Sequence, residues 1–206
     1  MDSLDLQVIQ QAQHWVTAGQ PVWLCTVLST FGSAPRGPGA MLVAMASGEH
    51  RGSLSGGCVE EDFMERLCTG QFAPVNQVVR YGDGGLAPTL ELPCGGVLEV
   101  LIEYLAPEPQ TLEHLEILRQ ALTGQCVTTR CVTPGGLTRR VLPGTVNGPR
   151  VQVAAHEILI RVGPVVRLLL AGLSPVAEFC ASFGLALGYE VVVCDPRPQV
   201  LEGFAL

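Results

Sequence analysis

Two cysteines that stand next to glycine pairs are the residues of this chain best suited to chemistry. The two segments read Ser55-Gly56-Gly57-Cys58 and Cys94-Gly95-Gly96. Glycine has no side chain and readily adopts positive φ, so the backbone can bring several N–H groups around one thiol. Such an arrangement stabilises a thiolate or a bound anion, and the thiolate is the form that binds metals and attacks electrophiles. The pair of segments predicts a thiol-based binding site.

The position of Cys58 strengthens this prediction. The pattern over 59–69 predicts a helix, so Cys58 falls at a helix start, where unpaired N–H groups and the helix dipole lower a thiol pKa or hold an anion. The alternative is a glycine turn with an incidental cysteine. Glu60 and Glu61 are interpreted as favourable charges in the first helical turn rather than as catalytic groups.

A loop rich in glycine and proline, 31–39, contains Ser33 and the cation Arg36. Because the loop is stiff and joins two predicted strands, Arg36 could be held in position to bind a phosphate group bidentately. The alternative is a solvated surface charge. Glu99 and Glu103 alternate with apolar residues and are predicted to lie on the solvent face of a strand.

The spacing of the other thiols gives no metal site. Cysteines stand at positions 25, 58, 68, 94, 126, 131, 180 and 194, without a Cys-x-x-Cys pair, and the four histidines show no ligand spacing. A structural zinc site is therefore not expected. The remaining cysteines are predicted to be small core residues, with Cys25, Cys180 and Cys194 in apolar runs.

Composition excludes several classes of protein. The chain has 206 residues, 48% of them hydrophobic, a net charge of −7 and no lysine. The acidic balance argues against nucleic acid or an anionic membrane as the main partner, and the absence of lysine excludes a Schiff base or P-loop lysine. The amino terminus does not read as a secretory signal, so reduced thiols in the cytoplasm are expected.

The order of predicted elements indicates an α/β protein. We expect an N-terminal mixed α+β domain followed by a small or truncated Rossmann-like βαβ domain. The expected boundaries are 1–106 for the N-terminal domain, 107–164 for a connecting α+β segment and 165–206 for the βαβ unit. The glycine- and proline-rich stretch 134–149 is predicted to be a loop between two strands, the second over 150–160.

The C-terminal βαβ unit carries a partial dinucleotide fingerprint. Gly172 and Ala177 fit its first and third positions, and Asp195 ends the next predicted strand. Ser174 replaces the middle glycine, the one that pyrophosphate approaches, and this argues against NAD(P) binding. An NAD(P)-dependent oxidoreductase is nevertheless kept as an alternative function.

Taken together, the motifs resemble the XdhC/CoxI family of accessory factors for molybdenum hydroxylases. The matching segments are Gly32-Ser33-Ala34-Pro35-Arg36, Gly52 to Glu60, Cys94-Gly95-Gly96 and Cys194-Asp195-Pro196-Arg197. The resemblance implies a chaperone, not a turnover enzyme, that binds molybdenum cofactor (molybdopterin), protects it during sulfuration and delivers it. It also implies two partners: the large subunit of a molybdenum hydroxylase and a cysteine desulfurase. Self-association is left open.

The expected site brings Cys58 and Cys94 into one cleft. In this interpretation Gly56, Gly57, Gly95 and Gly96 allow close backbone approach, Ser55 and Ser33 line the site, and Arg36 contacts the phosphate. A thiolate suits molybdenum because a soft metal prefers soft ligands. A thiol redox or sulfur-relay protein that uses the same two cysteines remains a further alternative.

Overall fold

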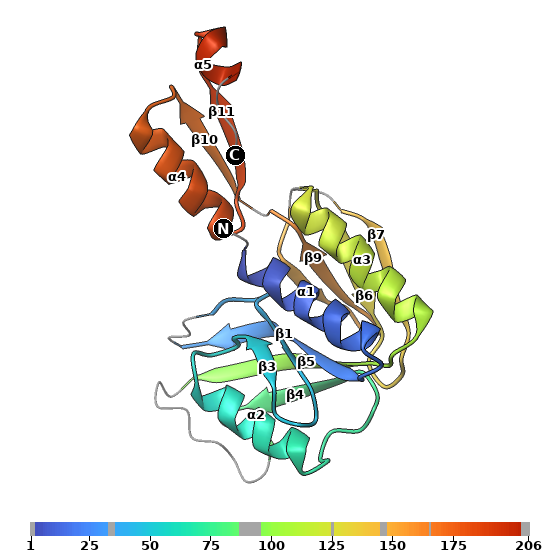
Figure 1. Ribbon diagram of the computed structural model, residues 1–206. Helices are drawn as coiled ribbons and strands as arrows, with labels where there is room; N and C mark the ends of the chain where they lie inside the picture. Colours follow the sequence, from blue (N-terminus) through green and yellow to red (C-terminus); the bar gives the residue numbers. More distant parts are fainter. Residues whose placement is uncertain are drawn as a thin grey trace.

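The strands of the protein form three separate sheets. The computed structural model describes residues 3–32, 36–86, 96–124, 126–144, 148–164 and 166–202. Two of the sheets are antiparallel and share one body with three helices, whereas the third is a parallel pair near the carboxyl end. Figure 1 shows this arrangement. The predicted mixed α/β class is confirmed.

The first sheet has five antiparallel strands in the order β3-β2-β1-β5-β4. Their bounds are β1 Val22–Phe31, β2 Met41–Ala44, β3 His50–Gly52, β4 Gln77–Tyr81 and β5 Val97–Leu105. The first seven residues of β1 are all buried. A run of this kind, apolar on both faces, is typical of a central strand covered from two sides.

Helices cover the two faces of this sheet. Helix α1 (Leu4–Thr17), capped by the Ser3 side chain, packs its apolar stripe on one face, and α2 (Cys58–Cys68) packs on the other. Two hydrophobic clusters result, one on each side of β1. Residues of β1 therefore alternate between the two cores, as the two-residue period of a strand requires.

The second sheet has four antiparallel strands in the order β7-β6-β9-β8 and lies beside helix α3 (Pro109–Thr123). Its strands are β6 Thr128–Val132, β7 Arg139–Pro143, β8 Val151–Val153 and β9 Ile158–Val162. Two predictions were wrong here. Strand β7 lies inside the stretch predicted as a loop, and 150–160 contains two strands rather than one. Both missed strands are edge strands, which tolerate polar residues and proline.

A buried ion pair joins the two antiparallel sheets. Glu103 on β5 accepts a hydrogen bond from the guanidinium of Arg130 on β6, and both side chains are completely enclosed. The prediction that Glu103 faces solvent was therefore wrong, because the second sheet covers this part of the first. Glu99 does lie at the surface, where it pairs with Arg80.

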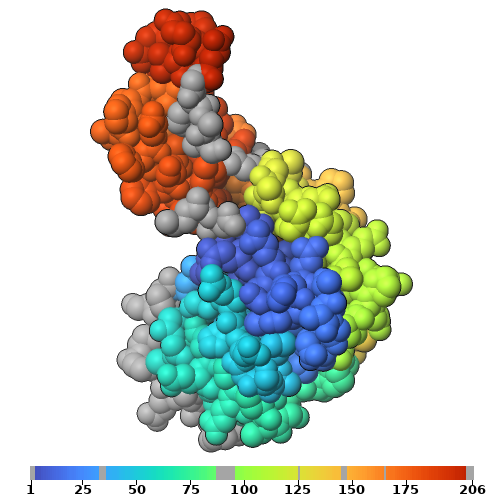
Figure 2. Space-filling model, in the orientation of Figure 1, coloured from blue at the N-terminus to red at the C-terminus, as the bar shows by residue number. Residues whose placement is uncertain are grey.

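The C-terminal unit confirms the predicted strand–helix–strand pattern. Strands β10 (Arg167–Ala171) and β11 (Glu190–Cys194) pair in parallel and are connected by α4 (Pro175–Ala186), and α5 (Pro198–Glu202) follows. Figure 2 shows this unit, in orange and red, as a lobe that projects from the main body. Its assignment to a Rossmann-like domain stays a prediction, as do the three domain boundaries.

Several cysteines predicted for the core lie elsewhere. Cys25 and Cys131 are buried, as expected, but the other described cysteines are exposed: Cys58, Cys68, Cys126, Cys180 and Cys194. In the C-terminal lobe the reason is the small size of the unit. Only Ala177, Ala181 and Gly184 of α4 are buried, so most of this apolar helix faces outward.

No helix among the described residues is long and apolar enough to cross a membrane.

Candidate functional site at one end of the five-stranded sheet

Strand register brings three of the sequence motifs to the same end of the first sheet. The last residue of β1, Phe31, pairs with Val97, the first residue of β5, and Tyr81 at the end of β4 pairs with Leu98. Strand β3 runs toward this end as well, since the N–H of Ser53 bonds the carbonyl of Met41. The segments that begin at Gly32, Ser53 and Gly82 therefore all leave the sheet here.

The loop that precedes α2 is organised by a single carboxylate, that of Glu60. Glu60 lies in the first turn of α2 and is only 8% exposed. Its two oxygens accept hydrogen bonds of 2.5–3.1 Å from the hydroxyls of Ser53 and Ser55 and the N–H groups of Leu54, Ser55, Gly56 and Gly57. Burial raises the pKa of Glu60, but the hydrogen bonds from Ser55, Ser53 and Leu54 outweigh it and hold the pKa well below its usual range.

This arrangement changes the expected role of the glycine pair. The N–H groups of Gly56 and Gly57 were predicted to face a ligand, and here they donate to Glu60 instead. The positive φ values of the two glycines, 94° and 148°, turn the chain so that successive N–H groups point at one acceptor. The N–H groups converge on the carboxylate of Glu60, whereas the prediction had placed them around the Cys58 thiol or a bound anion. The interpretation of Glu60 as a favourable charge at the helix start agrees with its position.

Cys58 stands next to this loop as the first residue of α2, and its side chain is exposed. An exposed thiol fits a soft metal or a cofactor bound through sulfur. The occupied N–H groups do not fit a phosphate at the same point.

Arg36 lies at a different cavity, of about 220 Å³. Residues of loop 36–40, the start of α1, the end of α4 and Arg150 line this cavity, and Cys58 is not among them. Arg150 pairs with Asp5 and packs over Gly39, where a built Cβ would fall 2.4 Å from its Nε. The buried Nε of Arg36 has no partner among the described residues. Arg36 can therefore bind an anion, although not in contact with Cys58.

The remaining predicted contacts of this site are only partly described. Ser33, Cys94 and Gly95 lie outside the described residues, so their convergence with Cys58 stays a prediction. Gly96 is buried and lies against Gly82, where a built Cβ would come 2.4 Å from the Gly96 carbonyl oxygen. Gly82 has a φ of 90°, and this close approach allows no side chain there.

In the C-terminal lobe, Ser174 and Asp195 of the partial dinucleotide fingerprint make hydrogen bonds to other residues of the lobe. The hydroxyl of Ser174 caps α4 by accepting from the N–H of Ala177. Asp195, whose side chain is enclosed, accepts from the N–H of Leu173 and from Arg197, and these bonds hold its pKa below the usual range. Asp195 thus ties the loop after β10 to the end of β11. Gly172 has a φ of 94° with open space beside it.

Two functional candidates were missed in the sequence. Arg150 follows Gly148-Pro149, and Arg139 lies within the same stretch that was predicted to be a loop. No local signal marks either residue, because each meets its neighbours only through contacts between distant segments.

Comparison with known proteins agrees with the resemblance found in the motifs. Residues 15–82 match the model of the XdhC and CoxI family. This match includes β1, β2, β3, the Glu60 loop and α2, which form most of the site described above. The resemblance to this family is confirmed.

Two curated relatives extend the similarity beyond the matched segment. The molybdenum cofactor insertion chaperone PaoD of Escherichia coli is 29% identical over 93% of this chain and 58% of its own length. A probable xanthine dehydrogenase subunit from Bacillus subtilis is 27% identical over 85% of this chain and 59% of its own. The chain thus spans less than two thirds of the length of these relatives.

A solved structure supports the fold. The crystal structure of a protein described as a xanthine dehydrogenase, from Bacillus halodurans, aligns with a TM-score of 0.59 and 21% identity. The alignment covers 97% of this chain and 64% of the other.

Proposed function

We propose that this protein binds molybdenum cofactor at the Cys58 end of the five-stranded sheet and assists its insertion into a molybdenum hydroxylase. The observation that carries the proposal is the exposed thiol of Cys58, presented at a helix start by a loop that Glu60 fixes. The family match over the same residues and the chaperone function of the Escherichia coli relative support it. Protection during sulfuration and handover to the hydroxylase large subunit are part of the proposal.

Among the described residues, two separate positions could contact the cofactor. The bound cofactor would supply a soft metal–sulfur centre and an anionic phosphate. Cys58 offers an exposed soft ligand, whereas Arg36 offers a cation at a separate cavity. Because Glu60 already uses the N–H groups of the glycine loop, the loop holds Cys58 in place rather than contacting the phosphate.

Replacing Cys58 by serine tests this proposal. The change keeps the size of the side chain and removes the soft sulfur, so affinity for isolated molybdenum cofactor should fall by at least about tenfold, the cost of losing even an outer partner of a metal site. Stability should not change, because the thiol is exposed. The measurement is equilibrium titration of the purified protein with isolated cofactor.

Cys68→Ser is the matched control. The Cys68 thiol is also exposed, but it lies at the opposite end of the same helix. It should bind cofactor like the unchanged protein. Equal affinity of both variants and the unchanged protein would show that Cys58 does not contact the cofactor. Absence of saturable cofactor binding by the unchanged protein would refute the proposed function.

The expected partners are the large subunit of a molybdenum hydroxylase and a cysteine desulfurase. Capture of the tagged protein from a host that expresses the candidate hydroxylase tests the first. Full hydroxylase activity in a strain that lacks this protein would argue against a role in maturation.

A further inference from the structure

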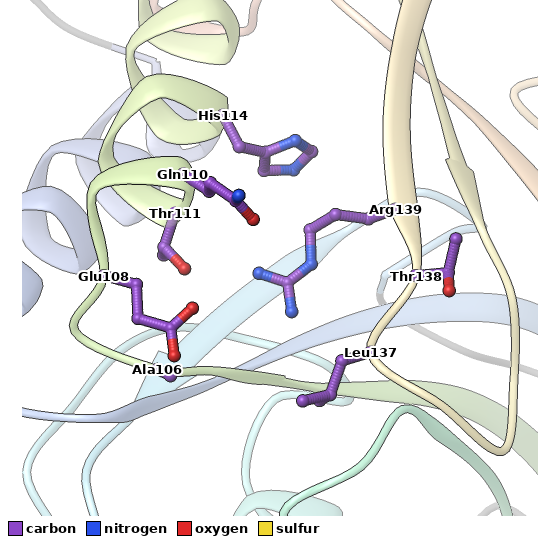
Figure 3. Close-up of a pocket in the computed structure, with 8 residues that line it drawn as sticks. All are labelled: Ala106, Glu108, Gln110, Thr111, His114, Leu137, Thr138 and Arg139. Carbon is purple, nitrogen blue, oxygen red and sulfur yellow. The ribbon is translucent and has the colours of Figure 1, made fainter.

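A second cavity, of about 460 Å³, lies where the main body brings three segments together. Its walls come from the end of β5, the first turns of α3 and the turn that leads into β7. The lining residues are Ala106, Glu108, Gln110, Thr111, His114, Leu137, Thr138 and Arg139. Figure 3 shows Arg139 extending from β7 toward the start of α3, with His114 and Glu108 on the facing wall.

The turn that immediately precedes Arg139 is held against the first sheet by hydrogen bonds. Asn76 is fully buried and its side-chain amide donates to the carbonyls of Thr133 and Thr138, while its own backbone bonds Gly135 and Gly136. Arg139 in turn donates to the carbonyl of Tyr104 at 2.7 Å. The guanidinium is therefore positioned before any ligand binds.

Two polar groups of this cavity have no partner among the described residues. His114 is only 6% exposed, yet its Nε2 neither accepts nor donates a hydrogen bond there. The buried Nε of Arg139 also has no hydrogen-bond partner among these residues. An unpaired buried polar atom is unfavourable, so a ligand group that pairs with these two atoms is favoured in the cavity.

The electrostatic field of the cavity favours negative charge. The N-terminus of α3 opens into it without a side-chain cap, and the Arg139 charge adds to the positive end of the helix dipole. Burial and Arg139 lower the pKa of His114 to about 4, so His114 is neutral at pH 7. Among the described lining residues, Glu108 carries the one opposing charge, and its side chain is exposed.

We propose that this cavity binds the anionic group, carboxylate or phosphate, of a small molecule. Arg139 would hold the anion beside the positive end of the α3 dipole, and His114 would pair with it from the inner wall. The volume leaves room for a ligand body beyond the anionic group, because small-molecule sites begin at about 300 Å³.

This site is separate from the Cys58 end of the sheet. Strand β5 begins at Val97, beside the Cys58 end, and finishes at Leu105, next to the cavity residue Ala106. Eight steps along an antiparallel strand span about 27 Å. The proposal therefore does not depend on cofactor binding at Cys58, and either can fail without the other.

The experiment titrates the full chain with inorganic phosphate and, separately, with succinate at constant ionic strength, and follows the His114 ring by NMR. Saturable binding of at least one probe is expected, and bound anion should raise the pKa of His114 because it stabilises the imidazolium. The probe that binds more tightly identifies the anion. The protein carries a net charge of −7, so general attraction of anions does not explain such binding.

Three variants distinguish anion binding in this cavity from nonspecific anion binding. Arg139→Met should weaken binding about 10- to 100-fold, the value of a charge-assisted hydrogen bond. Arg140→Met should not, because Arg140 pairs with Glu157 at the surface. Glu108→Gln should tighten binding, since it removes the opposing charge.

Should Arg139→Met not fold, the tighter binding of Glu108→Gln and the rise in the pKa of His114 still decide the question. Absence of saturation by both probes would overturn the proposal. So would weaker binding of the anionic probes by Glu108→Gln, which would show that the Glu108 carboxylate does not oppose the bound anion. An equal loss of affinity in Arg139→Met and Arg140→Met would also overturn it.

Discussion

Replacing Glu103 by leucine is expected to lower the free energy of unfolding by about 3–5 kcal/mol, because it leaves the charge of Arg130 buried without its partner. Both side chains are fully enclosed. Among the described residues, the guanidinium has additional contacts only to Thr26 at 3.4 Å and the sulfur of Met41 at 3.7 Å, and both are weak. Neither contact carries a compensating negative charge. Urea unfolding of both proteins at pH 7 gives the difference.

The double variant Glu103→Leu/Arg130→Met distinguishes an ion pair from two independent contributions. If the pair acts as a unit, the double variant should recover most of the lost stability, because apolar side chains of similar volume replace a buried pair at little cost. A loss in the double variant equal to the sum of the two single losses would contradict this view.

The same ion pair shows where sequence reasoning reaches its limit. Glu103 alternates with apolar residues along β5, and alternation predicts a solvent face when only one side of a sheet is covered. Here the second sheet covers the other side as well and supplies Arg130. Nothing within 97–105 indicates that a cation arrives from a strand that lies 27 residues further along the chain, so only the three-dimensional structure reveals the pair.

Elements with strong local signals were predicted well. The helix predicted over 59–69 corresponds to α2, and the βαβ unit predicted over 165–206 contains β10, α4 and β11 in that order. Strand β7 was missed because Arg139-Arg140 and Pro143 do not read as a strand. Such residues are accepted at a sheet edge, where one side of the strand makes no ladder bonds.

The candidate site was predictable to the extent that it is local. The placement of Cys58 at a helix start and the turn at Gly56-Gly57 follow from adjacent residues, and the structure contains both. The acceptor of the loop N–H groups was not predicted, although Glu60 stands only three residues beyond Gly57. The anion cavity at Arg139 and His114 had no sequence signal, because its walls come from three segments that meet only after folding.

Glu60→Gln is expected to lower the free energy of unfolding by about 2–3 kcal/mol at pH 7, the range for hydrogen bonds that involve a charged group. The carboxylate accepts six hydrogen bonds from the loop before α2, and the amide of glutamine replaces one of its two oxygens with a donor. Glu61→Gln is the matched control. It removes the same charge from the same helical turn, but Glu61 is exposed, so the loss should stay below about 1 kcal/mol.

The difference in the free energy of unfolding between the unchanged protein and Glu60→Gln should decrease as the pH falls. Folding lowers the pKa of Glu60, so its contribution to stability is fully present above the ordinary pKa of a glutamate and declines as the pH falls below that value. The two unfolding curves should therefore converge in acid. Hydrogen exchange of the Gly56 and Gly57 amides should be faster in Glu60→Gln at pH 7, since these N–H groups lose an ionised acceptor. A stability difference that does not change with pH, or equal losses in Glu60→Gln and Glu61→Gln, would show that the carboxylate does not hold the loop that presents Cys58.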